Sequence, residues 1–106
     1  MIRGFQTYEL AVQLYRRVET LETPKHMRDQ LLRAAQSVVL NLSEGSAKPT
    51  SRDKRKFFAI AFGSIREVQA VFDLIQNCDR DLIDLADRVA ACLYRLTYKA
   101  VRQPFP

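Results

Sequence analysis

The sequence RAAQSVVLNLSEGS, residues 33–46, decides the fold of this chain. Its apolar residues recur with the period of an α-helix and share one helical face: Ala34, Ala35, Val38 and Leu42. Polar residues follow the same period on an adjacent stripe: Ser37, Asn41 and Glu44. Serine and asparagine favour caps and turns over helix interiors. Their alignment beside the core therefore indicates polar partners on a neighbouring helix.

The composition is typical of a small globular domain built from helices. The chain has 106 residues, of which 47% are apolar and 27% are charged, which is enough for a single core without disulfides. It contains only three glycines and four prolines, and no stretch alternates as a strand would. We therefore expect a single all-α domain over residues 1–106.

Several features bear on where the protein works. The first residues show no signal-peptide pattern, and no apolar run approaches the roughly 18 residues that a membrane span needs. Cys78 and Cys92 lack the spacing of a metal or redox motif, so we interpret them as reduced thiols. We therefore expect a cytoplasmic protein with no membrane partner.

The amphipathic pattern divides the chain into four predicted helices, at about residues 7–21, 24–44, 51–77 and 82–102. Thr7 is the expected N-cap of the first helix, and Thr23 that of the second, with Pro24 at its first position. Short connections between long helices favour antiparallel neighbours. The sequence therefore predicts an up-down-up-down four-helix bundle.

The other helix ends also carry recognisable signals. Gly45 is expected to end the second helix in the left-handed conformation. Thr50, with Asp53 three residues later, resembles a capping box for the third helix. Asp79 or Asp81 is expected to cap the fourth.

The third and fourth predicted helices each carry a second apolar face beside the first. On the third helix, Phe57, Ile60 and Val68 belong to one face, and the other lies about 100° away. A second face is explained either by a central position of the third helix in the bundle or by an interface between subunits. The candidate interface residues are Phe58, Phe62, Ile65, Phe72, Ile83 and Tyr94.

Two polar stripes are expected to meet where the second and third helices pack. If these helices are antiparallel, Arg33 lies level with Ser64, and Glu67 lies one turn further along. A partly buried pair of Arg33 with Glu67 would fix the helix register, and loss of Glu67 would be strongly destabilising if Arg33 were buried. The alternative is a ligand site. The predicted polar seam consists of Arg33, Ser37, Asn41, Glu44, Ser64 and Glu67.

The same residues carry a resemblance to a known family. The pattern RAAQSVVLNLSEG, a short loop with Thr50 or Ser51, and then FFAIAFGSIRE resembles the four-helix-bundle family of 23S rRNA intervening-sequence proteins. The resemblance extends from about residue 5 to 96 and is specific between Arg33 and Glu67. Lys54 departs from the motif, since an aromatic residue is common at its position, and so does Leu42, where isoleucine is usual.

The resemblance implies a left-handed four-helix bundle that assembles as a ring, typically a homopentamer. The fold is also similar to that of the accessory proteins of diversity-generating retroelements, which bind a reverse transcriptase and nucleic acid. No enzymatic activity and no cofactor is attached to the family. We therefore expect a non-catalytic protein whose partners are copies of itself and RNA, DNA or a reverse transcriptase.

Basic residues mark two regions of the chain, whose net charge is +5. Five of the nine residues from Lys48 to Lys56 are basic, close to a helix N-terminus where backbone N–H groups suit phosphate. A second basic stripe follows the last turns of the fourth helix, where it also complements the helix dipole. The candidate nucleic-acid contacts are Lys48, Arg52, Lys54, Arg55, Lys56, Arg88, Arg95, Lys99 and Arg102. The alternative for both regions is a solvated surface.

Residues typical of catalytic or metal sites are scarce. His26 is the only histidine, and Gly45 and Gly63 are isolated, so neither a histidine-based metal site nor a glycine-rich phosphate loop is expected. The tyrosines lie at helical spacings and are interpreted as packing or interface residues. Two functions remain open: a non-catalytic accessory protein that associates with nucleic acid, and a scaffold ring that binds a protein partner such as a polymerase.

Overall fold

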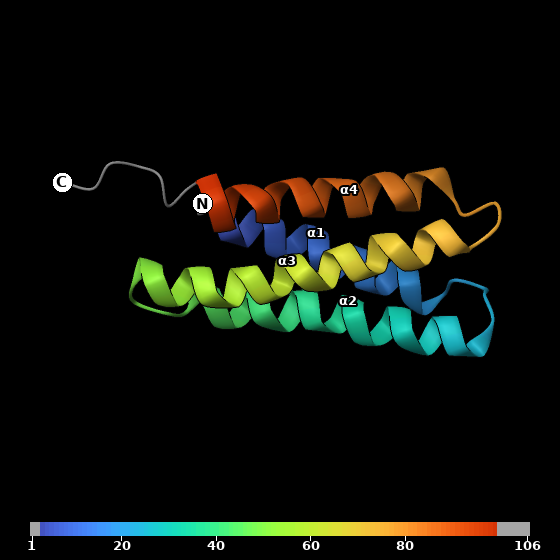
Figure 1. Cartoon of the computed structure of the whole chain (residues 1–106), viewed down its shortest axis with the longest axis horizontal. Coiled ribbons are helices and arrows are strands. Elements are labelled where there is room, and N and C mark those ends of the chain that lie inside the picture. Colours follow the sequence, from blue (N-terminus) through green and yellow to red (C-terminus); the bar gives the residue numbers. More distant parts are fainter. Residues whose placement is uncertain (1–2, 100–106) are drawn as a thin grey trace.

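The computed structural model describes residues 3–99, which form four α-helices and one short π-helix and contain no strand. The elements are α1 Arg3–Glu19, α2 Lys25–Ser46, α3 Ser51–Leu74, α4 Arg80–Tyr94 and the π-helix η1 Arg95–Lys99. Each α-helix runs antiparallel to the one before it, and α1 lies diagonally across from α3 (Figure 1). The described residues therefore form a four-helix bundle, as the apolar periodicity predicted.

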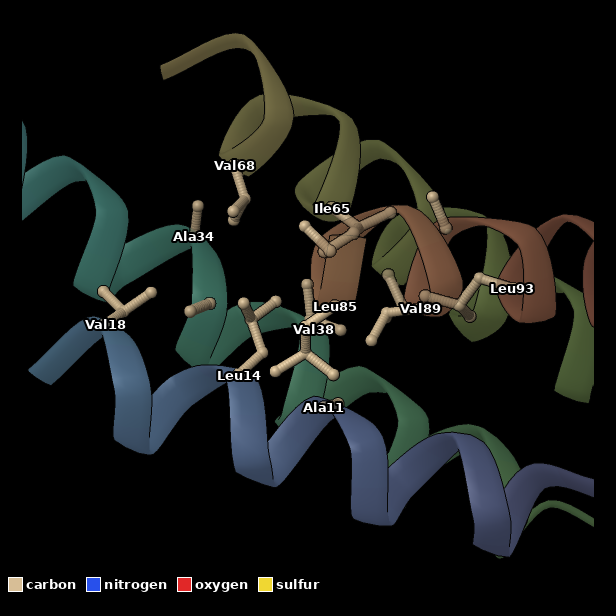
Figure 2. Close-up of a cluster of buried hydrophobic side chains, with 14 of the residues drawn as sticks. Ala11, Leu14, Val18, Ala34, Val38, Ile65, Val68, Leu85, Val89 and Leu93 are labelled. Carbon is tan, nitrogen blue, oxygen red and sulfur yellow. The ribbon is translucent and has the colours of Figure 1, made fainter. Parts of the chain in front are cut away.

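The core runs along the axis of the bundle and takes side chains from all four α-helices. In Figure 2, Leu14 of α1, Val38 of α2 and Ile65 of α3 point toward Leu85 and Val89 of α4. These five side chains are almost completely removed from solvent, and burial of this kind is the main favourable term in folding.

The start of α1 differs from the prediction. Thr7 is not an N-cap, because α1 begins at Arg3 and Thr7 lies inside the helix. Thr7 is buried on the inward face, in helical register with Ala11, Leu14 and Val18. The predicted N-cap, Thr7, is therefore a residue of the core-facing side of α1.

The start of α2 also differs in detail. Pro24 occupies the N-cap position itself, and the helix begins at Lys25 without a side-chain cap. The hydroxyl of Thr23 instead lies 3.8 Å from the Met27 sulfur. The two remaining N-caps are as predicted: Thr50 accepts a hydrogen bond from the Asp53 backbone N–H, and Asp79 accepts one from that of Asp81.

Gly45 does not end α2 in a left-handed conformation. It lies within the helix, which continues to Ser46, and no described glycine has a positive φ. Gly45 is buried, and a Cβ added there would lie 2.7 Å from Cε1 of Phe58. The glycine is therefore required by close helix packing rather than by a turn.

The turn between α3 and α4 comes earlier than predicted. The third helix ends at Leu74 rather than near residue 77. Asn77 adopts φ of 58°, in the left-handed region that asparagine tolerates better than most residues. This residue lets the chain reverse direction before α4 begins at Arg80. The predicted end of the fourth helix, residue 102, lies outside the described residues.

The second apolar face of α3 belongs largely to the core of the single chain. Phe58, Ile65 and Phe72 are buried within the bundle, so the prediction that they lie at a subunit interface is wrong for an intact bundle. The buried side of α3 lies between the two predicted faces because α3 packs against both α2 and α4. Of the remaining candidates, Phe62 and Ile83 are half-buried and Tyr94 is exposed.

Candidate nucleic-acid interface

The polar seam lies where α2 packs against α3. The hydroxyls of Ser37 and Ser64 are 2.8 Å apart, at hydrogen-bonding distance. Asn41 donates through Nδ2 to the Ser37 hydroxyl at 3.1 Å and to the Ser37 carbonyl at 2.9 Å. The two serines and the asparagine therefore satisfy one another, as a register-setting contact between two helices requires.

The charged part of the seam is more exposed than expected. Arg33 forms an ion pair with Glu67, which also accepts a hydrogen bond from Gln30. Ser37, rather than Arg33, lies opposite Ser64, so the helix register differs from the predicted one by about a turn. The Arg33 side chain is 63% exposed and that of Glu67 is 32% exposed. Glu44 does not join the seam, since it pairs with Lys48.

Two lysines of the first basic region hold the α2–α3 connection together. Lys48 lies 3.3 Å from the Glu44 carboxylate and 5.1 Å from the centre of the Phe57 ring. Lys54 donates to the carbonyl oxygen of Ser46, at the C-terminus of α2, at 3.0 Å. A cation at this end of a helix is favourable because the exposed carbonyls carry partial negative charge. Lys54 therefore has a structural role in this connection.

The other three cations of this region face solvent. Arg52, Arg55 and Lys56 are exposed on the first turns of α3, and none of them forms an ion pair with a carboxylate of the described residues. Asp53 lies among them, and its backbone N–H is already taken by Thr50. This surface is open to an anion, and the helix N-terminus adds partial positive charge.

The second basic region occupies the end of α4 and η1. Arg88, Arg95 and Lys99 are exposed, and in the part of the chain that the structure describes they make no ion pair. One guanidinium nitrogen of Arg95 lies 3.4 Å from the Cys92 sulfur, an uncharged partner. Arg102 lies outside the described residues.

The fold brings the two basic regions to one end of the bundle. The N-terminus of α3 and the C-terminus of η1 lie at the same end because α3 and α4 are antiparallel (Figure 1). At the opposite end, Arg17 pairs with Asp79 at 3.1 Å and Lys25 with Asp29 at 2.8 Å, and Arg28 donates to the Glu19 backbone carbonyl. We call the first end, with Arg52, Arg55, Lys56, Arg95 and Lys99, the basic end.

Three aromatic rings lie between α3 and the end of α4, close to the basic end. The Phe62 ring centre is 5.9 Å from those of Tyr94 and Tyr98, and the two tyrosine rings are 5.1 Å apart. We call Phe62, Tyr94 and Tyr98 the aromatic cluster. The helical spacing of the tyrosines indicated packing or interface residues, and Tyr94 is 44% and Tyr98 45% exposed.

The remaining surface features give less support for a binding or catalytic site. A shallow groove of about 280 Å³ between α1 and α2 is lined by Val12, Tyr15, Val39 and Leu40, among others. Burial, with a smaller contribution from Asp79, raises the pKa of the Cys78 thiol, which disfavours the reactive thiolate. Within residues 3–99, no group of three or more histidine, cysteine or acidic residues is placed to hold a metal ion. No described helix is long and apolar enough to cross a membrane.

Comparison with known proteins places the chain in a family. A family model described as 23S rRNA-intervening sequence protein matches residues 5–95. Searches of curated proteins and of solved structures give no match. The matched range includes the whole motif from Arg33 to Glu67 and all four α-helices apart from the first two residues of α1. The chain therefore belongs to the family of 23S rRNA-intervening sequence proteins.

Proposed function

We propose that this protein is a non-catalytic, oligomeric accessory protein that associates with RNA or DNA through its basic end. The observation that carries this proposal is the convergence of two basic regions, separate in the sequence, on one end of the bundle. The exposed cations there have no carboxylate partner within the described residues, whereas Arg17, Lys25 and Arg80 at the opposite end each pair with an aspartate.

The physical basis is phosphate recognition. Arginine binds phosphate through paired N–H donors, and Arg52 and Arg55 present free guanidinium groups near a helix N-terminus. Each neutralised phosphate releases counterions, so binding of this kind weakens steeply as salt increases. Contacts to phosphate alone give little preference for base sequence.

The test compares two double variants that remove the same charge from opposite ends. Arg52→Gln with Arg55→Gln alters the basic end, and Lys25→Gln with Arg80→Gln alters the other. Affinity for a structured RNA and for a duplex DNA is measured at several salt concentrations. The first variant should weaken binding to both, and the slope of log K against log salt should fall by roughly one unit per lost contact.

The control variant should behave like the parent apart from a small effect of net charge. Equal losses in both variants would show that only net charge matters and would contradict a defined interface. If the first variant keeps the parent's affinity and salt slope, Arg52 and Arg55 belong to a solvated surface that does not bind nucleic acid.

We also infer a ring of about five copies as the working form. Exposed apolar side chains on one chain support association with other copies: Leu40, Ile60 and Leu74 are each about half exposed or more. A ring would repeat the basic end several-fold and strengthen its field. Sedimentation velocity at micromolar concentration should give a species near five times the 12.3 kDa chain mass, and a monomer would contradict the ring.

A scaffold that binds a protein such as a reverse transcriptase is the second candidate function. It is favoured by the groove between α1 and α2, whose mixed polar and apolar lining includes Leu40 at 58% exposure. Leu40→Lys should then reduce co-purification of a co-expressed reverse transcriptase and leave nucleic-acid affinity unchanged. Loss of nucleic-acid binding alone would instead support the first function.

A further inference from the structure

The aromatic cluster is unusual because its rings contact one another yet remain open to solvent. Phe62 comes from α3, Tyr94 ends α4 and Tyr98 lies in η1. Phenylalanine rings are mostly buried, as Phe58 and Phe72 are in this chain, and Phe62 is half-buried against the core. Tyr94 and Tyr98 instead leave almost half of their surfaces exposed.

Cations border the cluster on both helices. On α3, Arg55 lies two turns before Phe62 and Arg66 one turn after it. Arg95 and Lys99 each follow a tyrosine of the cluster directly in the sequence. All four cations are exposed. Among the described residues, Arg66 donates to the Gln69 side-chain oxygen at 3.0 Å and Arg95 donates to the Cys92 sulfur, and both of these acceptors are uncharged.

An acidic side chain, Asp87, also lies on the surface between α3 and α4, on the side away from the basic end. Asp87 lies about two turns before Tyr94 on α4 and accepts a hydrogen bond from Gln69 at 2.8 Å. Arg66, Gln69 and Asp87 thus form a short chain of contacts that closes one side of the surface. The side toward the basic end, with Arg55, Arg95 and Lys99, remains positive.

The backbone under the cluster is also unusual. Residues Arg95–Lys99 form a π-helix, a rare geometry that is found mostly as single turns and often at functional sites. In this turn Leu96 and Thr97 are buried while Tyr98 is exposed and contacts Phe62. Tyr94 and Tyr98 lie four residues apart and therefore share one side of this segment, as i and i+4 residues also do in an α-helix.

We propose that the aromatic cluster is a stacking platform for unpaired bases, so that the partner at the basic end is single-stranded nucleic acid. This inference rests on the proposed nucleic-acid function and adds its ligand class. Proteins that bind single strands combine a positive surface with aromatic rings on which bases stack. A duplex keeps its base faces covered and gains nothing from the rings.

The test uses Tyr98→Leu, which keeps an apolar side chain but removes the ring, and Tyr98→Phe, which keeps the ring. The probes are an unstructured oligouridine and a duplex RNA of equal length, at one fixed salt concentration. Tyr98→Leu should weaken oligouridine binding at least about 5-fold and duplex binding less than about 2-fold. Tyr98→Phe should bind both like the parent.

A direct readout is available because the chain contains no tryptophan. Its tyrosine fluorescence should be quenched by oligouridine, and the quenching should be reduced in Tyr98→Leu. Tyr15→Leu is the control, since Tyr15 lines the groove between α1 and α2. It should leave the affinity for oligouridine unchanged.

The remaining outcomes separate this inference from the proposed function. Equal losses for oligouridine and duplex, or no loss for either, would overturn the stacking platform and leave the nucleic-acid function standing. Failure of the parent to bind any nucleic acid would overturn both. A change in sedimentation of Tyr98→Leu without a selective loss of oligouridine binding would show that the cluster is a contact between copies, which also overturns the platform.

Discussion

Gly45 of α2 packs directly against the ring of Phe58 of α3. A Cβ at position 45 would lie 2.7 and 2.8 Å from two ring carbons of Phe58 and 3.1 Å from Cβ of Phe57. Phe58 is buried, so its ring has little room to move away. This contact sets how closely the C-terminal half of α2 approaches the N-terminal half of α3.

Gly45→Ala should therefore destabilise the protein despite the better helix propensity of alanine. The gain from propensity is about 1 kcal/mol, and overpacking of a buried site costs about 1–3 kcal/mol. We expect a net loss of up to about 2 kcal/mol in the free energy of unfolding, measured by urea denaturation. A more stable Gly45→Ala protein would show that the two helices separate without cost.

Gly63→Ala is the matched control in the neighbouring helix. A Cβ at position 63 would meet no other atom within 4 Å, and the position is exposed within α3. The same substitution should here raise the free energy of unfolding by about 0.5–1 kcal/mol through helix propensity alone. Destabilisation would mean that Gly63 approaches a second chain in solution, which sedimentation of the variant would then reveal.

The ion pair between Arg33 and Glu67 should contribute little to stability. The sequence analysis predicted a strong effect on condition that Arg33 was buried, but its side chain is 63% exposed. Exposed ion pairs contribute about 0.2–1 kcal/mol. A double-mutant cycle with Arg33→Ala and Glu67→Ala should give a coupling energy in that range, and the coupling should shrink in high salt. A coupling of several kcal/mol would show that the pair is desolvated in the working assembly.

The fold was predictable because local and long-range signals agree. The apolar period located four helices, and Thr50 and Asp79 cap α3 and α4 as expected. Thr7 and Gly45 misled the prediction for one reason. Threonine and glycine are common at helix ends, so both residues were placed there. In the structure both are buried against other helices, and this packing cannot be read from the local sequence.

The candidate site was predictable only in its parts. Helix spacing placed Ser37 and Ser64 on the facing surfaces of adjacent helices, but it put Arg33 level with Ser64, about a turn from the observed Ser37–Ser64 contact. The meeting of the two basic regions depends on the antiparallel arrangement of α3 and α4. The aromatic cluster was missed because Phe62 and Tyr98 are far apart in the chain and come together only across two helices.

Thr97 holds the one buried side-chain oxygen of the described residues that lacks a hydrogen-bond partner. A buried polar group without a partner costs about 1–3 kcal/mol, because it gives up its bonds to water. Thr97→Val removes the hydroxyl and keeps the branched shape, so it should leave stability unchanged or raise it by up to about 1 kcal/mol. Thermal denaturation is the measurement. A clear loss of stability would indicate that the hydroxyl has a partner in the assembled protein.

Within the first basic region, residues 48–56, we expect some cations to stabilise the fold and others to bind nucleic acid. Lys54 donates to the Ser46 carbonyl at the end of α2, whereas Arg55, its neighbour in the sequence, is exposed. Lys54→Gln should reduce the free energy of unfolding by about 0.5–1 kcal/mol, because it weakens a charge-assisted contact with a helix C-terminus. Arg55→Gln removes a like charge near a helix N-terminus and should hold stability or raise it slightly.

For nucleic-acid binding, the larger effect should come from Arg55→Gln rather than from Lys54→Gln. Arg55→Gln should lower the salt slope for RNA by roughly one unit per engaged copy, and Lys54→Gln should leave the slope close to that of the parent. Both variants lose a single charge, so the difference between them cannot come from net charge. If Lys54→Gln lowers the slope as much as Arg55→Gln, the Lys54 ammonium leaves the Ser46 carbonyl to contact phosphate, and the whole region from Lys48 to Lys56 acts as one interface.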